Sequence, residues 1–138
     1  MRVVLDCSAT LAWVYGDETS AAIRRLFDGI AEEGALVPAL WRLEVANALT
    51  MATRRGRIAP DYRDAALRDL ALLDIATDPQ TGASAWSSTL ELADNCRLTG
   101  YDAAYLELAR RCSLPLATLD EELRAAARTV GVALPLDG

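Results

Sequence analysis

Short apolar runs alternate with longer segments of helical periodicity along the whole chain of 138 residues. The runs that we interpret as strands are 3–5, 35–37, 74–77, 116–118 and 132–134. The segments that we interpret as helices are 8–15, 17–34 with Asp17 as its N-cap, 40–55, 60–73, 83–96, 102–112 and 120–129 with Asp120 as its N-cap. Strands separated by helices favour a parallel sheet that is covered on both faces. We therefore predict an α/β fold, with a central and mainly parallel sheet of about four to five short strands, in a single domain 1–138.

An aspartate directly follows the first apolar run, Val3-Val4-Leu5. A continuous apolar run is typical of a buried strand in a parallel sheet. A carboxylate inside such a strand would cost several kcal/mol in desolvation, on the order of the usual figures. We therefore expect Asp6 to lie where the strand ends, at the edge of the sheet where α/β proteins bind ligands.

Two residue types are missing, and their absence excludes much chemistry. The chain has no His, and all 14 of its basic residues are Arg. Triads built on Ser-His or Cys-His, imidazole zinc sites, phosphate-binding GxxxxGK[ST] loops and Schiff-base lysines are therefore excluded. The net charge of −6 argues against a protein that binds nucleic acid over a wide surface. Carboxylates remain as the main titratable groups.

The three cysteines form no CxxC pair, which favours a reducing compartment over a disulfide framework. We interpret Cys7 as a small core residue. The sequence shows neither a convincing signal peptide nor a stretch long enough to span a membrane. We therefore expect a soluble cytoplasmic protein with no membrane association.

Four acidic residues lie at strand ends or near helix starts. Asp6 ends the first run, Glu44 lies in an apolar helical segment, Asp102 opens a helix, and Asp120 follows the fourth run. Asn47 lies one turn after Glu44 on the same helical face. Because strand ends and the following helix starts share one edge of a parallel sheet, we predict that the four carboxylates meet there.

A cluster of four carboxylates predicts a site for a hard divalent cation. The charges repel one another, and Mg²⁺ or Mn²⁺ prefers oxygen ligands. A cation held in this way can activate a water and bind a phosphate oxygen, which allows phosphodiester hydrolysis without His or Lys.

Simpler structural roles stay open for each of these residues. Asp102, Asp120 and Ser8 could be helix N-caps, each stabilising its helix by about 1 kcal/mol. Thr118 could be an ordinary β-branched strand residue, and Asn47 could merely be tolerated in its helix. Glu44 is the hardest to explain in this way, because its neighbours in sequence are apolar.

Other features are open in the same way. Arg54-Arg55-Gly56-Arg57 could contact RNA phosphates, although cations at a helix C-terminus are the reading that we favour. The aromatic residues near the acids could stack on bases, although core or interface packing is favoured. They are Trp13, Tyr15, Trp41 and Tyr105.

Four stretches of the chain together resemble the PIN-domain family, and within it the VapC-type toxins of toxin–antitoxin pairs. They are VVLDCSATLAWVYGDE, LVPALWRLEVANAL, LTGYDAAYLELA and LPLATLDEEL, and the resemblance spans nearly the whole chain. It implies a three-layer α/β/α sandwich and a ribonuclease that depends on Mg²⁺, with Mn²⁺ as a substitute. It also implies an RNA substrate, with transfer RNA as a candidate, products with a 5′-phosphate and a 3′-hydroxyl, a homodimer, and a VapB-like antitoxin that blocks the site.

The residues that match the family's acids, in chain order, are Asp6, Glu44, Asp102 and Asp120. Those that match its polar positions are Ser8, Asn47 and Thr118. Our hypothesis is that three of the acids hold the metal and that Glu44 completes the shell, directly or through water, and helps to position the attacking water. The three polar residues would orient the carboxylates.

One alternative belongs to another functional class. Asp6-Cys7-Ser8 begins a loop like the D-x-S-x-S metal loop of non-enzymatic adhesion modules, with Thr10 in the last position. In that hypothesis the chain would bind a protein ligand and leave RNA intact, and Glu44 would have no role.

Overall fold

The computed structural model describes residues 2–137, and its centre is a sheet of short parallel strands. Among these residues the strands are β1 (Val3–Leu5), β2 (Ala35–Val37), β3 (Ile75–Thr77) and β4 (Leu116–Ala117), in the spatial order β3-β2-β1-β4. The predicted parallel α/β sheet is thus confirmed, and its four strands fall within a residue or two of the predicted runs.

The fifth predicted strand, 132–134, is wrong. This segment passes β4 with one backbone hydrogen bond, from the Leu116 N–H to the Ala133 carbonyl oxygen at 2.9 Å, and it lies outside every helix and strand. Pro135 follows, and because proline has no N–H it cannot continue a ladder.

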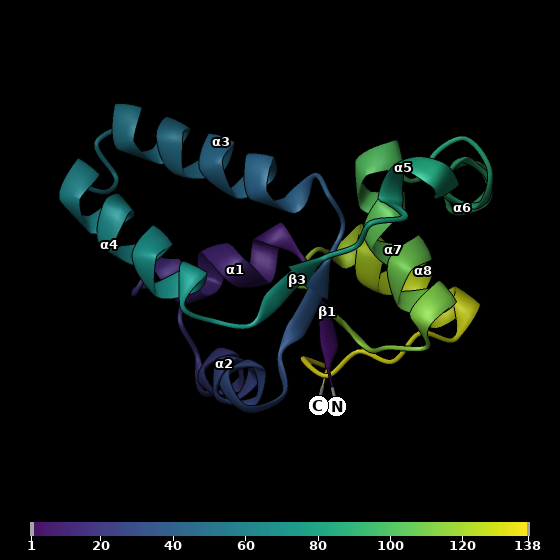
Figure 1. Cartoon of the computed structure of the whole chain (residues 1–138), viewed down its shortest axis with the longest axis horizontal. Coiled ribbons are helices and arrows are strands. Elements are labelled where there is room, and N and C mark those ends of the chain that lie inside the picture. Colours follow the sequence, from purple (N-terminus) through teal and green to yellow (C-terminus); the bar gives the residue numbers. More distant parts are fainter. Residues whose placement is uncertain (1, 138) are drawn as a thin grey trace.

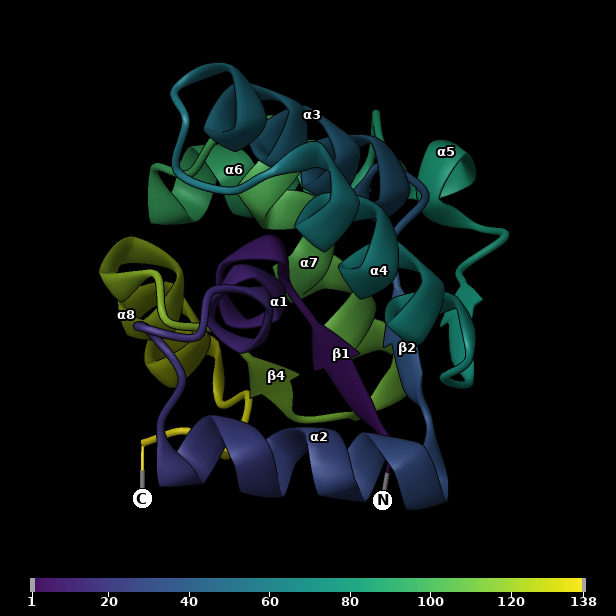
Figure 2. The ribbon, with the colours of Figure 1, turned by 90° about the vertical axis from the view of Figure 1, so that its left-hand side faces the viewer.

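Helices cover both faces of the sheet. They are α1 (Cys7–Val14), α2 (Ala21–Glu33), α3 (Trp41–Arg54), α4 (Pro60–Ala71), α5 (Thr81–Ser84), α6 (Ser88–Cys96), α7 (Gly100–Cys112) and α8 (Glu121–Val130). Figure 1 shows α1, α2 and α4 on one side of the strands and α7 and α8 on the other. Figure 2 looks onto the first side, with α2 in front and α3 beyond the carboxyl ends of β1 and β2. This is the three-layer sandwich that the resemblance implied.

The predicted start of α2 needs correction, whereas its predicted end is confirmed. The N-cap of α2 is Ser20, whose Oγ accepts the Ile23 N–H at 3.2 Å, whereas Asp17 lies outside the helix and pairs with Arg57 at 3.1 Å. At the other end of α2, Gly34 adopts φ +82° where a Cβ would lie 3.0 Å from the Asp74 carbonyl oxygen. A glycine is therefore required at the predicted stop.

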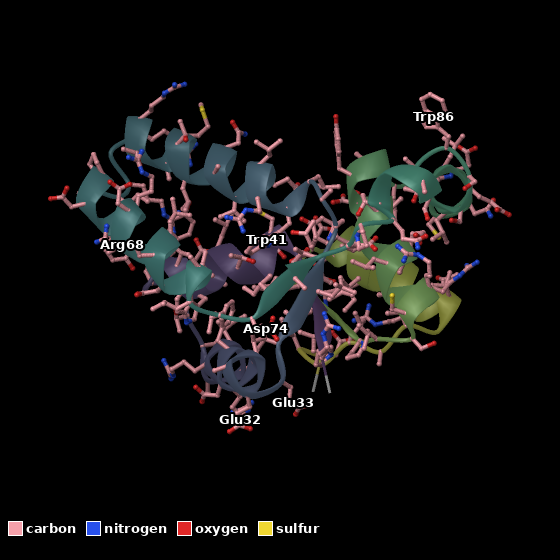
Figure 3. The ribbon with its side chains drawn as sticks, in the orientation of Figure 1. Glu32, Glu33, Trp41, Arg68, Asp74 and Trp86 are labelled. Atoms are coloured by element: carbon pink, nitrogen blue, oxygen red, sulfur yellow. The ribbon has the colours of Figure 1, made fainter. Side chains whose placement is uncertain are left out.

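The predicted helix 83–96 is two helices. The Asp78 carboxylate accepts the Gln80 N–H at 3.0 Å and the Thr81 hydroxyl at 3.1 Å, so the chain already turns into α5 at Thr81. Ser87, at φ −122° and ψ −99°, then interrupts the helical path before α6. Between the two helices Trp86 projects into solvent, 93% exposed (Figure 3).

The core lies between the sheet and both helical layers. Seven consecutive residues of α7, 103–109, are buried because this helix packs against β1 and β4 and against α6 and α8. On the other side of the sheet Trp13 stacks on Phe27 with ring centroids 4.8 Å apart, and Trp41 donates from Nε1 to the buried Thr10 hydroxyl at 3.1 Å. Trp41 points into the interior (Figure 3), as core packing requires.

A buried ion cluster, absent from the sequence predictions, joins β3 to α7. Arg111 donates to Asp78 at 2.6 Å and to Glu107 at 2.9 Å, and both carboxylates are buried. The pairing lowers the pKa of Asp78 despite its burial. In residues 2–137 no helix is both long and apolar enough to cross a membrane.

Candidate functional site

Asp6 sits at the junction of β1 and α1, where the sequence predicts a ligand-binding edge. It directly follows the strand and is the N-cap of the helix, and its Oδ1 accepts the Ala9 N–H at 3.0 Å. The same carboxylate accepts the Ser8 hydroxyl at 2.7 Å and the Thr118 hydroxyl at 2.5 Å. The Asp6 carboxylate therefore caps α1 and is held by two hydroxyl groups at the same time. The residue is only 5% exposed.

Ser8 and Thr118 connect the ends of β1 and β4. The Thr118 hydroxyl oxygen accepts the Asp120 N–H at 3.1 Å while the hydroxyl donates to Asp6. The Ser8 hydroxyl donates to Asp6 and accepts the Leu119 N–H at 2.9 Å. These four hydrogen bonds fix the Asp6 carboxylate and the loop that carries Asp120 relative to each other.

Glu44 reaches the site from the first turn of α3, half-buried. Its Oε1 accepts a hydrogen bond from the hydroxyl of Tyr105 on α7. The Tyr105 ring is 1% exposed, as core packing predicts, but its hydroxyl serves the acidic site, which sequence reasoning missed. Burial and the adjacent Glu44 carboxylate raise the pKa of Tyr105, so the tyrosine stays a neutral donor.

Asp102 and Asp120 differ in how they relate to their helices. Asp102 lies in the first turn of α7, but the N-cap of that helix is Thr99, whose Oγ1 accepts the Asp102 N–H at 3.1 Å. The Asp102 carboxylate is therefore not needed as a cap. Asp120 is the N-cap of α8, and its Oδ1 accepts the Leu123 N–H at 2.9 Å.

The four acids interact electrostatically. Burial raises the pKa of Asp6, and the nearby Asp120 charge adds to the rise. Burial also raises the pKa of Glu44, where the charges of Asp102 and Asp6 contribute and the Tyr105 hydrogen bond opposes them. For Asp102, burial and the Asp120 charge raise the pKa. Each of the four carboxylates thus repels at least one other across elements that are distant in sequence.

The chemistry of this donor set suits a hard divalent cation. All four donors are carboxylates, and a cation's charge would offset the mutual repulsion between them. Among residues 2–137 no three acidic or cysteine side chains are yet arranged to hold one ion together. The carboxylates of Asp6, Glu44 and Asp120 each accept a hydrogen bond, which holds them in place and leaves further lone pairs on their oxygens.

Asn47 is a predicted site residue for which the structure shows no hydrogen bond to the acids within residues 2–137. Its side chain is exposed on α3. The neighbouring Cys7 is half-buried, and burial together with the charges of Glu44 and Asp6 raises the pKa of its thiol to about 12. Cys7 is therefore an uncharged packing residue beside the site, as predicted.

Known proteins resemble this chain along most of its length. The sequence profile described as PIN domain matches residues 3–129. "Ribonuclease VapC3" of Mycobacterium tuberculosis is 36% identical over 129 residues, which cover 91% of this chain and 87% of that protein. "Ribonuclease VapC3" of Pyrobaculum aerophilum is 32% identical over 123 residues, covering 89% of this chain and 92% of that protein.

Solved structures give the same picture of the fold. The crystal structure of PAE2754 from Pyrobaculum aerophilum superposes with a TM-score of 0.71 at 26% identity, covering 98% of this chain and 84% of that one. The crystal structure of FitAcB from Neisseria gonorrhoeae gives a TM-score of 0.61 at 16% identity, covering 96% and 95%. At that identity the second likeness concerns the fold alone.

Proposed function

Because this chain belongs to the PIN-domain family, we propose that it is a divalent-metal-dependent endoribonuclease of the VapC type. The observation that carries the proposal is the buried Asp6 carboxylate at the strand end, oriented by Ser8 and Thr118 and electrostatically coupled to other acids. The ribonuclease names of relatives more than 30% identical over most of the chain support the nuclease activity.

In this proposal Asp6, Asp102 and Asp120 hold Mg²⁺, or Mn²⁺ in its place, and Glu44 completes the shell directly or through water. The bound ion supplies a lowered pKa for a coordinated water and charge neutralisation at the scissile phosphate. Ser8 and Thr118 keep the Asp6 carboxylate in one orientation. The loop that carries Asp120 is held by the same two hydroxyls.

Glu44 is the residue suited to handle the proton of the attacking water. It is a carboxylate in the first turn of α3 and interacts electrostatically with Asp6 and Asp102, so it lies where a proton acceptor is needed. The Tyr105 hydroxyl donates to Oε1 and leaves Oε2 without that hydrogen bond. In-line attack by water then leaves a 5′-phosphate and a 3′-hydroxyl.

The partners follow from the same family membership. We propose that the substrate is cytoplasmic RNA, with transfer RNA as the first candidate, and that a small VapB-like antitoxin inhibits the enzyme by covering the site. We also propose that the 138 residues act as one domain in a homodimer. Asn47, which is exposed on α3, would help to orient the carboxylates.

The adhesion-module alternative fits the local geometry less well. That loop needs the Thr10 hydroxyl to be available to a cation. Thr10 is fully buried, its hydroxyl donates to the Asp6 carbonyl oxygen at 2.8 Å, and its Oγ1 accepts from the Trp41 indole. Its hydrogen-bonding capacity is therefore used in the core.

The proposal is tested by incubating a transfer-RNA pool with the purified protein and Mn²⁺, beside a sample with EDTA and beside Asp6→Asn. We expect discrete cuts that both controls lose. Cutting that survives Asp6→Asn would mean that the assigned site is wrong. Intact RNA together with demonstrated Mn²⁺ binding and capture of a protein ligand would favour the adhesion module.

A further inference from the structure

A groove of about 420 Å³ opens beside the acidic site, between α1, α3 and the loop after β4. Its lining includes Ser8 and Leu11 from α1, Met51 and Arg55 from the end of α3, and Leu119 from the loop. None of these side chains belongs to the acid cluster itself. The volume falls within the range of roughly 300–1,000 Å³ that small-ligand sites occupy.

One end of the groove touches the proposed reaction centre. Ser8 lines the groove, and its hydroxyl donates to the Asp6 carboxylate at 2.7 Å. Leu119 lines it too, and this residue lies between Thr118 and Asp120 with its N–H bonded to Ser8 at 2.9 Å. A molecule that occupies the groove therefore lies immediately next to the acids.

The groove also has an apolar surface that is open to solvent. Met51 is 39% exposed and Leu119 is 38% exposed, although both are large apolar side chains. With Leu11 they offer a surface on which a flat, partly apolar group such as a nucleobase can lie. Methionine is suited to such a surface because its flexible thioether adapts to differently shaped partners.

Among the charged residues that line the groove, Arg55 is the cation that can bind a phosphate. Glu18 lines the groove, but Arg57 pairs with it at 2.5 Å and also pairs with Asp17 at 3.1 Å. Arg55, by contrast, has no carboxylate partner within residues 2–137. The chain has a net charge of −6, yet the Arg55 guanidinium in this groove has no carboxylate partner among the described residues. The same groove reaches the acid cluster through Ser8.

We propose that this groove binds the nucleotide next to the scissile phosphate of single-stranded RNA, with the base against Met51 and Leu119 and a phosphate on Arg55. A cationic groove with surfaces for base packing is the usual arrangement for single-stranded RNA. The proposal rests on the nuclease function proposed above and names contacts that select its substrate. It also reverses the reading of Arg55 as only a cation at a helix C-terminus.

RNA is the occupant that we favour, because a guanidinium without a carboxylate partner suits a phosphate and the groove continues onto the acids. The path from Arg55 to Ser8 leads onto Asp6, where a phosphodiester must lie to be cut. The acid cluster itself repels RNA, and Arg55 supplies a positive charge beside it that attracts the RNA backbone.

The test uses the full chain in EDTA, so that RNA is bound and not cut. The affinity of a fluorescein-labelled, unstructured ten-nucleotide RNA of mixed sequence is measured by anisotropy at several salt concentrations. Arg55→Ala should weaken binding roughly tenfold, the effect of one lost charged hydrogen bond, and should lower the salt slope by about one. Met51→Ala should weaken it about fourfold, as expected if the base covers an area of the side chain equivalent to about one methylene, with the salt slope unchanged.

The matched control is Arg68→Ala, which removes the same charge from the exposed surface of α4 (Figure 3). It should stay within about twofold of the wild type, because Arg68 does not line the groove. Equal losses for the Arg55 and Arg68 variants would mean non-specific attraction and would overturn the proposal. Unchanged circular dichroism and melting temperature exclude misfolding of each variant.

Cleavage with Mn²⁺ separates this proposal from the nuclease function itself. If the wild type cuts RNA, Arg55→Ala should raise KM roughly tenfold and leave kcat near its wild-type value. A wild-type KM for Arg55→Ala in an active enzyme would refute the groove and leave the nuclease intact. A wild type that binds RNA through Arg55 but never cuts would refute the nuclease alone. Wild-type RNA affinity for Arg55→Ala, combined with lost inhibition by a co-purified protein inhibitor, would assign the groove to that protein and overturn the RNA proposal.

Discussion

Replacing Tyr105 by phenylalanine tests whether the contact between α7 and Glu44 matters for the metal site. The change removes one hydroxyl from a ring that is 1% exposed, so the packing of the core is kept. The lost interaction is a hydrogen bond to a carboxylate, worth about 1.5–3 kcal/mol when both partners stay buried. Glu44 is only half-buried and can bind water instead, so we expect a loss of about 1 kcal/mol in the free energy of unfolding.

The effect on metal binding should be larger than the effect on stability. Groups that orient a ligating carboxylate commonly contribute about 10–100-fold to metal affinity or activity. We therefore expect Tyr105→Phe to weaken Mn²⁺ binding, measured by titration calorimetry, by at least about tenfold. The cleavage rate at limiting Mn²⁺ should fall by a similar factor.

The pH dependence provides an independent readout. The Tyr105 hydrogen bond lowers the pKa of Glu44 against the effect of burial. Its loss should raise that pKa further, so the acidic limb of the pH–rate profile should move to higher pH. A merely structural role for Tyr105 would not produce this shift.

The matched control is Tyr101→Phe, on the same helix but 69% exposed. It should leave Mn²⁺ affinity, rate and pH profile unchanged. Wild-type Mn²⁺ affinity and an unshifted pH profile in Tyr105→Phe would refute the reasoning that Tyr105 positions Glu44 for catalysis.

Three further predictions concern stability. Asp6→Asn should raise the urea denaturation midpoint at neutral pH and abolish cleavage. Burial raises the pKa of Asp6, so the folded state loses stability as the pH rises from the unfolded-state pKa of 3.8 through the raised folded-state pKa. Below pH 3.8 aspartate is mostly protonated in both states, and the variant should show no gain in urea unfolding. Arg111→Met leaves the buried carboxylates of Asp78 and Glu107 without their cation and should lower the free energy of unfolding in urea by about 3 kcal/mol. This is the lower end of the usual range, because Arg111 is partly exposed. A loss below about 1 kcal/mol would contradict this. Ser20→Ala should cost about 1 kcal/mol through the lost N-cap of α2, and Asp17→Ala less than half of that; the reverse order would restore Asp17 as the cap.

The sheet was predictable from sequence because most residues of β1, β2 and β4 are buried, although the edge strand β3 is partly exposed. Buried strands leave a continuous apolar signal, and β2 lies where the run Ala35-Leu36-Val37 predicted it. The errors occurred where a local pattern allowed two outcomes. Both Asp17 and Ser20 are good N-caps, and only the path of the chain into α2 decides between them. The apolar run 132–134 resembled a strand, but Pro135 and a single backbone bond keep it outside the sheet.

The candidate site was predictable where its residues follow strand ends. Asp6, Ser8 and Thr118 meet at the carboxyl edge because β1 and β4 are neighbours in the sheet. The role of these residues as orienting groups for a metal ligand stays a prediction.

Tyr105 was missed because its partner lies 61 positions earlier in the chain and its apolar spacing is that of a core residue. The contact of Arg111 with Asp78, 33 positions apart, was hidden for the same reason. Sequence periodicity indicates which face of a helix is buried, but not which polar group of a distant segment that face contacts.

The central claim is that the carboxylates of Asp6, Glu44, Asp102 and Asp120 form one metal centre that cuts RNA. It is tested most directly by titrating Mn²⁺ into metal-free protein and following bound Mn²⁺ and RNA cleavage in the same samples. We predict that both rise together in the wild type and that both are lost in Asp6→Asn. Cleavage that precedes Mn²⁺ binding, or that persists in Asp6→Asn, would contradict the account.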